Sequence, residues 1–346
     1  MMVKTINWIL PLLMALLVAG CIEQIDIRLH DEYIVPVIDG RLTDQKGGHY
    51  IKLSYSLPLS ENNYKPIYGA SVILYDENDN QEIFVEFDSG TYVSTASFAL
   101  IGNTRYTLEV IIGQDEYIAE NLTLKTAPPI KNVAVKESNI SVLSYNNQVV
   151  QKRGITLSAV IENPEKTENY FKYEIVPTHM VVAERAEEIS PYKTCYITNG
   201  DNTFSILRDR SGGYNHDITF VGFSDKFLHR ISFLVRQLSM SAEAFIFWEK
   251  VEAFRENTGG LFDRPHFTIK GNMKHRTDPE KEMLGLVGLY AISEHRIFMS
   301  QYDLSYALFV DPEYCYPIMP PVPPECFNCL AYNGKIVTNS RPAWWR

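Results

Sequence analysis

Residues 51–57 have the sequence IKLSYSL, in which apolar or aromatic side chains alternate with polar ones. Ile51, Leu53 and Tyr55 therefore share one face of an extended chain, while Lys52 lies on the other. A period of two is the pattern of a β-strand, whereas a helix repeats its apolar residues every three or four positions. The stretch predicts a β-strand that buries one face.

The same alternation recurs along much of the chain. It is found in four further segments: 106–112, 155–159, 171–175 and 231–235. Clusters of Gly, Asn and Asp separate the strand-like segments of the first third, as expected of tight turns. A content of 21 Tyr and 17 Phe adds residues that favour strands. Short strands at this spacing predict a mainly β fold built from β-sandwiches.

The first 20 residues are expected to be a signal peptide, because Lys4 precedes an apolar run and Val18-Ala19-Gly20-Cys21 ends it. Small residues before a cysteine are typical of a lipoprotein signal, so Cys21 is the predicted lipidation site, with a tether over 21–32. An uncleaved anchor is one alternative, although its apolar run of about 13 residues is shorter than the ~20 that span a bilayer. A chance cysteine after an ordinary signal peptide is the other.

The sequence indicates two domains. Cleavage before Cys21 would leave about 325 residues, more than the ~250–300 that one core usually supports. Hydrophobic residues at 45% and charged residues at 21% describe a globular chain. Pro128 and Pro129 cannot donate backbone hydrogen bonds and interrupt strand pairing. We therefore predict a first β-sandwich over 33–126 and a second β-rich domain over 131–311.

One α-helix is expected near residues 241–257, inserted into the second domain. Ser241 is a suitable N-cap, and Glu243 lies in the first turn, where the helix dipole favours an anion. Thr258-Gly259-Gly260 would end the helix. Apolar residues at helical spacing would form a stripe packed on the domain core: Ala244, Phe247, Trp248, Val251 and Phe254.

Four cysteines remain if Cys21 carries a lipid, namely Cys195, Cys315, Cys326 and Cys329. An even number in an exported chain predicts structural disulfides, and the sequence leaves the three pairings open. Cys326 and Cys329 also have the spacing of a zinc-binding or redox-active pair. Only one such pair exists, however, and several prolines precede it. We expect disulfides that pin a proline- and cysteine-rich tail, 312–346, to the surface.

No catalytic motif is present, since the chain lacks His-Glu-x-x-His, Gly-x-Ser-x-Gly and a P-loop. A Ser/His/Asp set can be assembled on paper, but a triad is defined by geometry and not by composition. The residues that could enter it are His216, Asp217, Ser224, Asp225 and His229. We predict a protein that is not an enzyme and uses no cofactor.

The sequence also argues against metal and nucleic acid ligands. The acidic segment 76–80 lacks the glycine and glutamate of an EF-hand loop and is expected to be a solvated turn. His266 and His275 show no spacing typical of metal ligands. A net charge of −10 is unsuited to binding phosphate backbones. No metal site is predicted, and the ligand-binding residues stay unassigned.

The chain resembles a large Bacteroidetes family of lipoproteins catalogued only as domain of unknown function 4249. The motifs that carry the resemblance are 21–26, 37–40, 68–72, 238–245, 247–248, 260–265, 269–272, 278–279, 284–285, 326–329 and 342–345. The resemblance implies an outer-membrane lipoprotein, often encoded beside TonB-dependent receptors, with no established activity. By fold-level analogy alone, the first domain also resembles immunoglobulin- or transthyretin-like modules of surface proteins.

These observations favour a lipid-anchored accessory protein of the outer membrane, on its periplasmic or cell-surface face, with a TonB-dependent receptor as partner. The alternative is a surface lipoprotein that binds glycans or peptides, with tyrosines, Trp344 and Trp345 as stacking platforms. A hydrolase with an unfamiliar site is the more remote alternative.

Overall fold

The computed structural model describes residues 34–57, 63–146, 148–200, 204–210, 212, 215–256, 269–305, 308, 314–316 and 321–346. Several features expected from the sequence lie outside these ranges: the signal peptide over 1–20, Cys21, the tether over 21–32, Thr258-Gly259-Gly260 and His266. Within the described ranges, no helix combines the length and apolar character needed to cross a bilayer.

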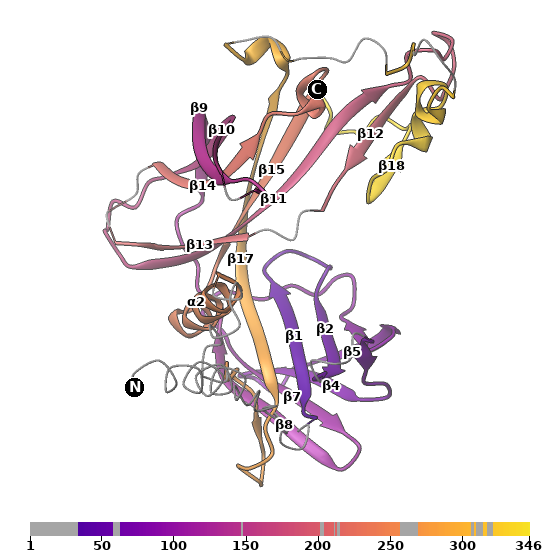
Figure 1. The fold of residues 1–346 in the computed structure, drawn as a ribbon. Coiled ribbons are helices and arrows are strands. Elements are labelled where there is room, and N and C mark those ends of the chain that lie inside the picture. Colours follow the sequence, from indigo (N-terminus) through magenta and orange to yellow (C-terminus); the bar gives the residue numbers. More distant parts are fainter. Residues whose placement is uncertain are drawn as a thin grey trace, which may run out of the picture.

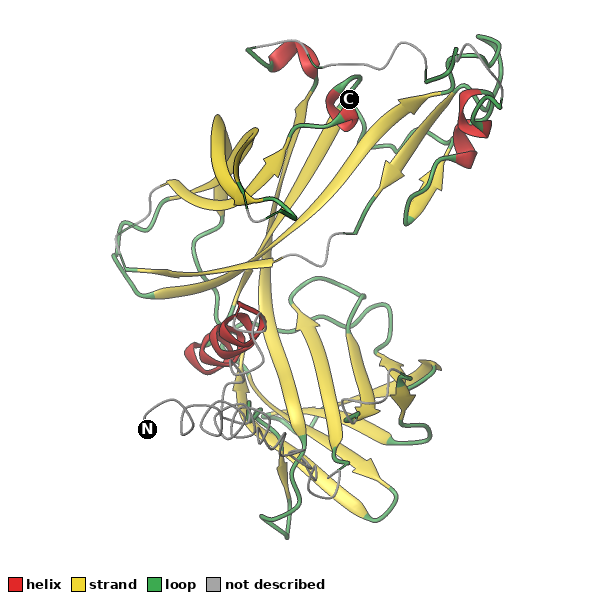
Figure 2. Ribbon diagram, viewed as in Figure 1, coloured by secondary structure: helices red, strands yellow, loops and turns green. Residues whose placement is uncertain are grey.

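The fold is mainly β, as the alternation predicted. Across the described residues it comprises a mixed 15-stranded sheet, a 3-stranded sheet and one α-helix, α2 (Ala242–Glu256), with short 3-10 turns. Figure 2 shows α2 as the longest helical segment, lying beside the waist of a two-lobed molecule.

The N-terminal lobe contains the first eight strands and β16, together with the first half of β17 (Figure 1). The bounds of its strands are β1 (Pro36–Thr43), β2 (Tyr50–Tyr55), β3 (Lys65–Pro66), β4 (Ser71–Asp76), β5 (Gln81–Asp88), β6 (Thr91–Val93), β7 (Arg105–Ile112), β8 (Asp115–Thr123), β16 (Lys274–His275) and β17 (Leu284–Met299).

As far as the structure describes it, the C-terminal lobe contains the remaining strands, the second half of β17 and four 3-10 turns. Its elements are β9 (Ile130–Leu143), β10 (Val149–Ile161), β11 (Asn169–Val182), β12 (Thr194–Thr198), β13 (Phe204–Asp209), β14 (Asn215–Gly222), η1 (Asp225–Phe227), β15 (Ile231–Ser239), η2 (Gln301–Asp303), η3 (Pro324–Cys326), η4 (Cys329–Ala331) and β18 (Ile336–Thr338).

Strand β17 belongs to both lobes. Its first half runs parallel to β1, from Val37 opposite Leu284 to Thr43 opposite Tyr290. Its second half runs antiparallel to β15, ending with Ile231 opposite Met299. Figure 1 shows β17 as one continuous orange strand that passes from the lower lobe into the upper. A strand of 16 residues is about 50 Å long, so β17 is long enough to extend through both lobes.

The N-terminal lobe closes around one core because its sheet turns at β5. This strand pairs with β4 through its first residues and with β6 through its last, so both halves of the sheet face inward. Ile51 and Leu53 are fully buried there, as their alternation predicted. Tyr55 and Leu57 continue the same face beyond the core and are 37% and 36% exposed.

The structure divides residues 131–311 differently from the expected second domain. Met273, Met283 and Val287 belong to the N-terminal core, and His275 of β16 pairs with Tyr117 of β8. Without β17, β1 would leave one side of its backbone unpaired, which is unfavourable for a strand above a buried face. The chain therefore returns to the first lobe after building most of the second.

The C-terminal lobe buries its core between two sheets. The small sheet, in the order β14-β10-β9, faces β11 and β15 of the large sheet. Ile155, Leu157 and Ala159 of β10 are fully buried against Phe171 of β11 and Phe233 of β15. The alternating segments that predicted strands at 155–159, 171–175 and 231–235 thus supply most of this core.

Helix α2 covers the junction of the lobes. Its N-cap is Ser241, whose Oγ accepts a hydrogen bond from the Ala244 amide at 3.2 Å. Ala244 and Phe245 are buried, and the Trp248 indole donates to the Tyr290 hydroxyl of β17 at 3.1 Å. The predicted apolar stripe was wrong in part. Phe254 was expected to be buried but is 43% exposed, and Phe245 was not expected in the stripe but is buried.

An ion pair also joins the lobes. Nη1 of Arg41 on β1 lies 3.0 and 2.9 Å from the two carboxylate oxygens of Glu174 on β11. Lys172 lies 3.7 Å from the same carboxylate and 3.7 Å from the ring centroid of Trp248. Burial lowers the pKa of Lys172, and the Glu174 carboxylate opposes that shift. This cluster fastens β11 and α2 over the first lobe beside the shared strand.

We predict that Gly285→Ala will unfold the N-terminal lobe more readily. Gly285, the second residue of β17, has φ +95°, and a Cβ there would overlap the Ile38 carbonyl oxygen. The loss of unfolding free energy should exceed about 3 kcal/mol in urea titrations. Gly48→Ala is the matched control, because Gly48 also has a positive φ, +71°, but has open space around it. Its cost should be about 1 kcal/mol, from backbone strain alone. Equal costs for the two variants would contradict the close β1–β17 approach.

Candidate functional site

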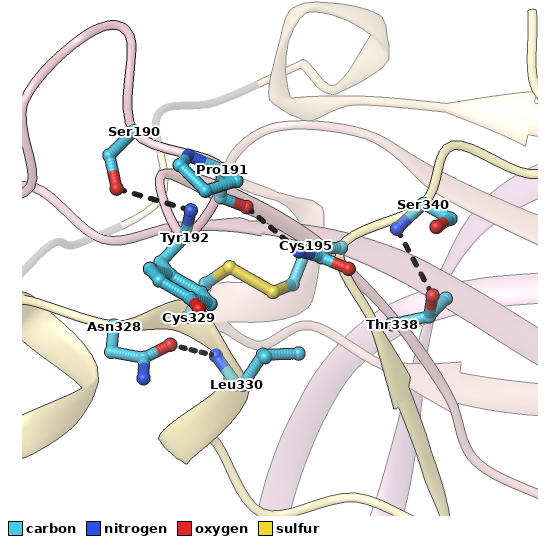
Figure 3. Close-up of a disulfide and its surroundings, with 10 residues drawn as sticks. Ser190, Pro191, Tyr192, Cys195, Asn328, Cys329, Leu330, Thr338 and Ser340 are labelled. Carbon is cyan, nitrogen blue, oxygen red and sulfur yellow. Dashed lines mark hydrogen bonds between the residues drawn. A yellow bond between two sulfur atoms is a disulfide. The ribbon is translucent and has the colours of Figure 1, made fainter.

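All four expected cysteines are paired in the structure. Cys195 bonds to Cys329 and Cys315 to Cys326, each with a Cα–Cα distance of 5.5 Å. Cys326 and Cys329 therefore bond to different partners and do not act together as a zinc-binding or redox pair. Figure 3 shows the Cys195–Cys329 disulfide between strand β12 and the turn at η4.

The tail is fastened by more than its disulfides. Strand β18 pairs with β12, with Thr338 opposite Tyr196. Beside the disulfide, the Asn328 side chain accepts a hydrogen bond from the Leu330 amide at 3.0 Å, which starts η4 (Figure 3). Through β18, the tail thus supplies the edge strand at one end of the large sheet.

The terminal tryptophans have mainly structural contacts. Trp345 is 6% exposed and packs edge-on against Tyr196 and Phe298, at centroid distances of 4.9 and 5.5 Å. Trp344 is 39% exposed, but the Arg296 guanidinium lies 3.5 Å from its ring centroid. Trp345 has no open face for a sugar ring, and one face of Trp344 is occupied.

The structure does not bring together the residues that the sequence analysis considered for a Ser/His/Asp triad. His216 Nε2 lies 3.6 Å from the buried carboxylate of Asp209. The neighbouring Asp217 accepts a hydrogen bond from Ser158 at 2.6 Å. His229 follows η1, next to the end of β11, and does not pair with either acid. The structure offers no nucleophile–base–acid chain through these side chains.

The candidate metal residues have ordinary structural partners. Asp76 accepts hydrogen bonds from the backbone and side chain of Asn80, which closes a hairpin turn. His275 packs edge-on against Tyr117 and lies 3.4 Å from Asp115. Among the residues that the structure describes, no three His, Cys, Asp or Glu side chains converge as metal ligands.

A pocket of about 380 Å³ lies in the C-terminal lobe, and we call it the distal pocket. The end of β11, the segment around η1 and the disulfide-bonded tail line this open pocket. It is lined by His179, Met180, Val181, Val182, Glu184, Asp225, Lys226, Leu228, His229, Tyr314, Cys315 and Tyr332.

His179 forms the most buried polar part of this lining. Only 6% of it is exposed, and its Nδ1 has no hydrogen-bond partner. Burial lowers the pKa of His179 to about 4, with Lys226 adding to the shift and Asp225 opposing it. Burial also lowers the pKa of His229. Both imidazoles are therefore neutral near pH 7, with nitrogen atoms that can donate or accept.

Tyrosines and carboxylates surround the remaining lining. Tyr314 donates its hydroxyl proton to Glu325, and that hydrogen bond, followed by burial, raises the pKa of Tyr314 to about 12. Burial raises the pKa of Tyr332, and the carboxylates of Glu325, Glu184 and Asp225 add to the shift. Two phenol rings and two carboxylates thus line the same pocket as the neutral histidines.

The sequence pointed to part of this site for another reason. Asp225 and His229 were considered only as members of a triad, and His179 was not considered at all. The available signal was a histidine within the strand-like run 175–182, where its neighbours are mostly apolar. From the sequence alone, a single polar residue in such a run can lie either in the core or at the wall of a pocket.

Strand β17 sets the distance between the distal pocket and the start of β1. His179 lies opposite Ile231, which lies opposite Met299 at one end of β17. Leu284, at the other end of β17, lies beside Val37 at the start of β1. About 50 Å of strand therefore separates the pocket from the point where the chain enters the fold.

Fold and site together define a mainly β protein of two lobes on one shared strand, with a disulfide-fastened tail and a pocket at one end. A family model described as a domain of unknown function, DUF4249, matches residues 22–296. The chain belongs to this family, which confirms the expected resemblance to domain of unknown function 4249. No curated protein matches the chain.

Removal of the two disulfides should have unequal effects. The Cys195–Cys329 bond closes 134 residues and the Cys315–Cys326 bond 11. From loop-closure entropy, we expect a Cys195→Ala/Cys329→Ala variant to lose about 5 kcal/mol of unfolding free energy and the Cys315→Ala/Cys326→Ala variant about 3. Denaturant titration of the oxidised proteins measures both. A larger loss for the short loop would contradict this assignment.

Acid should destabilise the protein through His179. The unfolded chain protonates this side chain below its ordinary pKa of 6.5, whereas the folded chain does so only near pH 4. Stability is therefore present above pH 6.5 and is lost as the pH falls toward 4. Between about pH 7.5 and 5, wild type should lose about 2 kcal/mol more than His179→Gln. Parallel pH profiles of the two proteins would disprove the burial of a neutral imidazole.

Proposed function

We propose that the chain is a non-enzymatic, lipid-anchored binding protein of the outer membrane that works with a TonB-dependent receptor or transporter. The observation that carries the proposal is the separation of the distal pocket from the start of β1 along β17. An anchor at Cys21, a short tether before β1, would hold one end of the molecule at the bilayer. The pocket would then face away from it.

The proposal treats each lobe as a β-sandwich module of the immunoglobulin or transthyretin-like type. Supporting it, each lobe has its own apolar core with strands on either side. The Arg41–Glu174 pair and helix α2 would keep the two modules in one orientation. A rigid body of this kind can present loops and pocket to a partner on either face of the membrane.

The second candidate is a surface lipoprotein that binds glycans or peptides. The distal pocket favours it through Tyr314 and Tyr332, which offer phenol rings beside hydrogen-bonding side chains. The buried position of Trp345 counts against the tryptophans as its platform. A hydrolase stays the remote third candidate, because His216 lies beside Asp209 and Asp217 is hydrogen-bonded to Ser158, so these side chains do not support a triad.

Anchoring is tested with Cys21→Ser. We expect the wild-type chain to sediment with envelopes and to carry an acyl adduct in mass spectrometry. The variant should lose both, because one lipid-modified cysteine supplies the membrane affinity. If the variant partitioned with envelopes as wild type does, the lipid anchor would be disproved.

Partnership is tested by affinity purification from detergent-solubilised envelopes. A β-barrel receptor should be recovered with the wild-type chain, and Glu184→Arg at the distal pocket should lower its recovery roughly tenfold. Glu120→Arg is the matched control, because Glu120 is exposed on β8 in the other lobe. Recovery of no receptor under any nutrient condition would overturn the proposed partnership.

A further inference from the structure

Strand β9 ends the small sheet with a long open edge. It pairs with β10 along one side, and no described strand pairs with its other side. The two ends of the large sheet are short strands, β16 with two residues and β18 with three, whereas β9 has 14. Short edge strands, charges and prolines are the usual protection against pairing with another chain. A long open edge that lacks them is suited to the addition of a strand.

The outer part of the β9–β10 hairpin carries none of this protection. Residues 138–151 contain no Asp, Glu, Lys, Arg or Pro, although charged residues make up 21% of the chain. Several large apolar side chains of this run are exposed, namely Leu143, Tyr145, Val149 and Val150. Neither charge nor proline therefore opposes the pairing of this segment with another strand.

The same part of the hairpin extends beyond the small sheet as a two-stranded ribbon. Strand β14 pairs with β10 from Gly154 to Val160, whereas β9 and β10 continue to pair as far as Leu143 opposite Val149. A two-stranded ribbon alone is only marginally stable in water. The pairing of β9 with a further strand would stabilise it.

The register of the hairpin shows which backbone groups face the open edge. The Ser144 amide donates to the Gln148 carbonyl at 2.8 Å, so residue 144 directs its backbone groups toward the β10 side. Because this direction alternates along a strand, Asn139, Ser141 and Leu143 direct their N–H and C=O groups away from β10. No described strand pairs with these groups. The backbone of another extended strand matches them in spacing and in the order of donors and acceptors.

We infer that the added strand is β9 of a second copy of this chain, antiparallel to the first and with Ser141 on the two-fold axis. The segment 138–143 is itself extended, uncharged and open along one edge, so it is complementary to its own copy. Ile140 then lies opposite Val142 of the second copy, a pair of β-branched side chains that stabilises a sheet. The two small sheets would form one continuous sheet in the order β14-β10-β9-β9-β10-β14.

Charge selects this part of β9 and this register. Two copies that each carry a net charge of −10 repel one another as a whole, which favours contact through an uncharged segment. The Glu137 carboxylate already accepts hydrogen bonds from the Ser305 amide and hydroxyl. An axis at Ile140 would place this carboxylate opposite the apolar Leu143 of the second copy. An axis at Ser141 places Asn139 there instead.

Disulfide trapping tests the register. The purified chain from residue 21 onward contains every described residue, and Cys21→Ser removes both a lipid and a free thiol. In that background Ser141→Cys should form a covalent dimer, because directly opposed Cα atoms lie about 5.5 Å apart, within disulfide reach. Asn139→Cys is the matched control on the same strand, since its two copies would lie about 13 Å apart. We expect cross-linking of Ser141→Cys to be at least roughly tenfold faster.

Sedimentation velocity of the same chain measures the pairing without a cross-link. Six residues a side make a small interface, so we expect a dimer with a Kd on the order of tens of micromolar. Ser141→Pro removes one outward N–H and is tolerated on an edge strand, so it should weaken the dimer at least roughly tenfold and leave the monomer folded. Ser141→Thr keeps that N–H and should leave the Kd within about twofold of the parent chain.

Three results would each overturn the inference: a chain that stays monomeric up to about 1 mM, equal cross-linking of Ser141→Cys and Asn139→Cys, or a dimer that Ser141→Pro does not weaken. A monomer that pairs with a strand of another protein falls under the first. The pairing of two β9 strands requires neither the lipid nor a receptor. Failure of the envelope experiments with an intact dimer would therefore disprove only the proposed function.

Discussion

The structure depends on one backbone constraint, the pairing of β17 with β1 along its first half and with β15 along its second. Strand β17 cannot change register against β1 without also moving its second half against β15. The relative position of the lobes is thus set by two ladders of hydrogen bonds on a single strand. The Arg41–Glu174 pair and helix α2 add side-chain contacts at the same junction.

The position of the two walls of the distal pocket depends on β17 and on the tail. One wall is the end of β11, whose register is held by β15 and so by β17. The other wall is the tail, held by two disulfides and by the pairing of β18 with β12. Both walls are therefore held covalently or cooperatively, and the buried imidazole of His179 lies between them.

Much of the fold could be predicted because its signals are local. Alternation identified the strands that contain Ile51, Leu157 and Phe233, and Ser241 marked the start of α2. The stripe on α2 was misjudged at Phe254 because helical spacing does not reveal where the neighbouring sheet ends. His179 could not be identified, since its pocket is made by a tail more than a hundred residues away.

The sequence by itself determined the strand-rich class, the capped helix, the family and the even set of cysteines, because each depends on residues close together or on composition. Only the tertiary structure decided that Leu284 pairs with Val37, that Cys195 bonds to Cys329, and that His179 lines a cavity. These outcomes depend on contacts between segments far apart in the chain. Their free energies come from burying shared apolar surface and satisfying backbone groups in three dimensions.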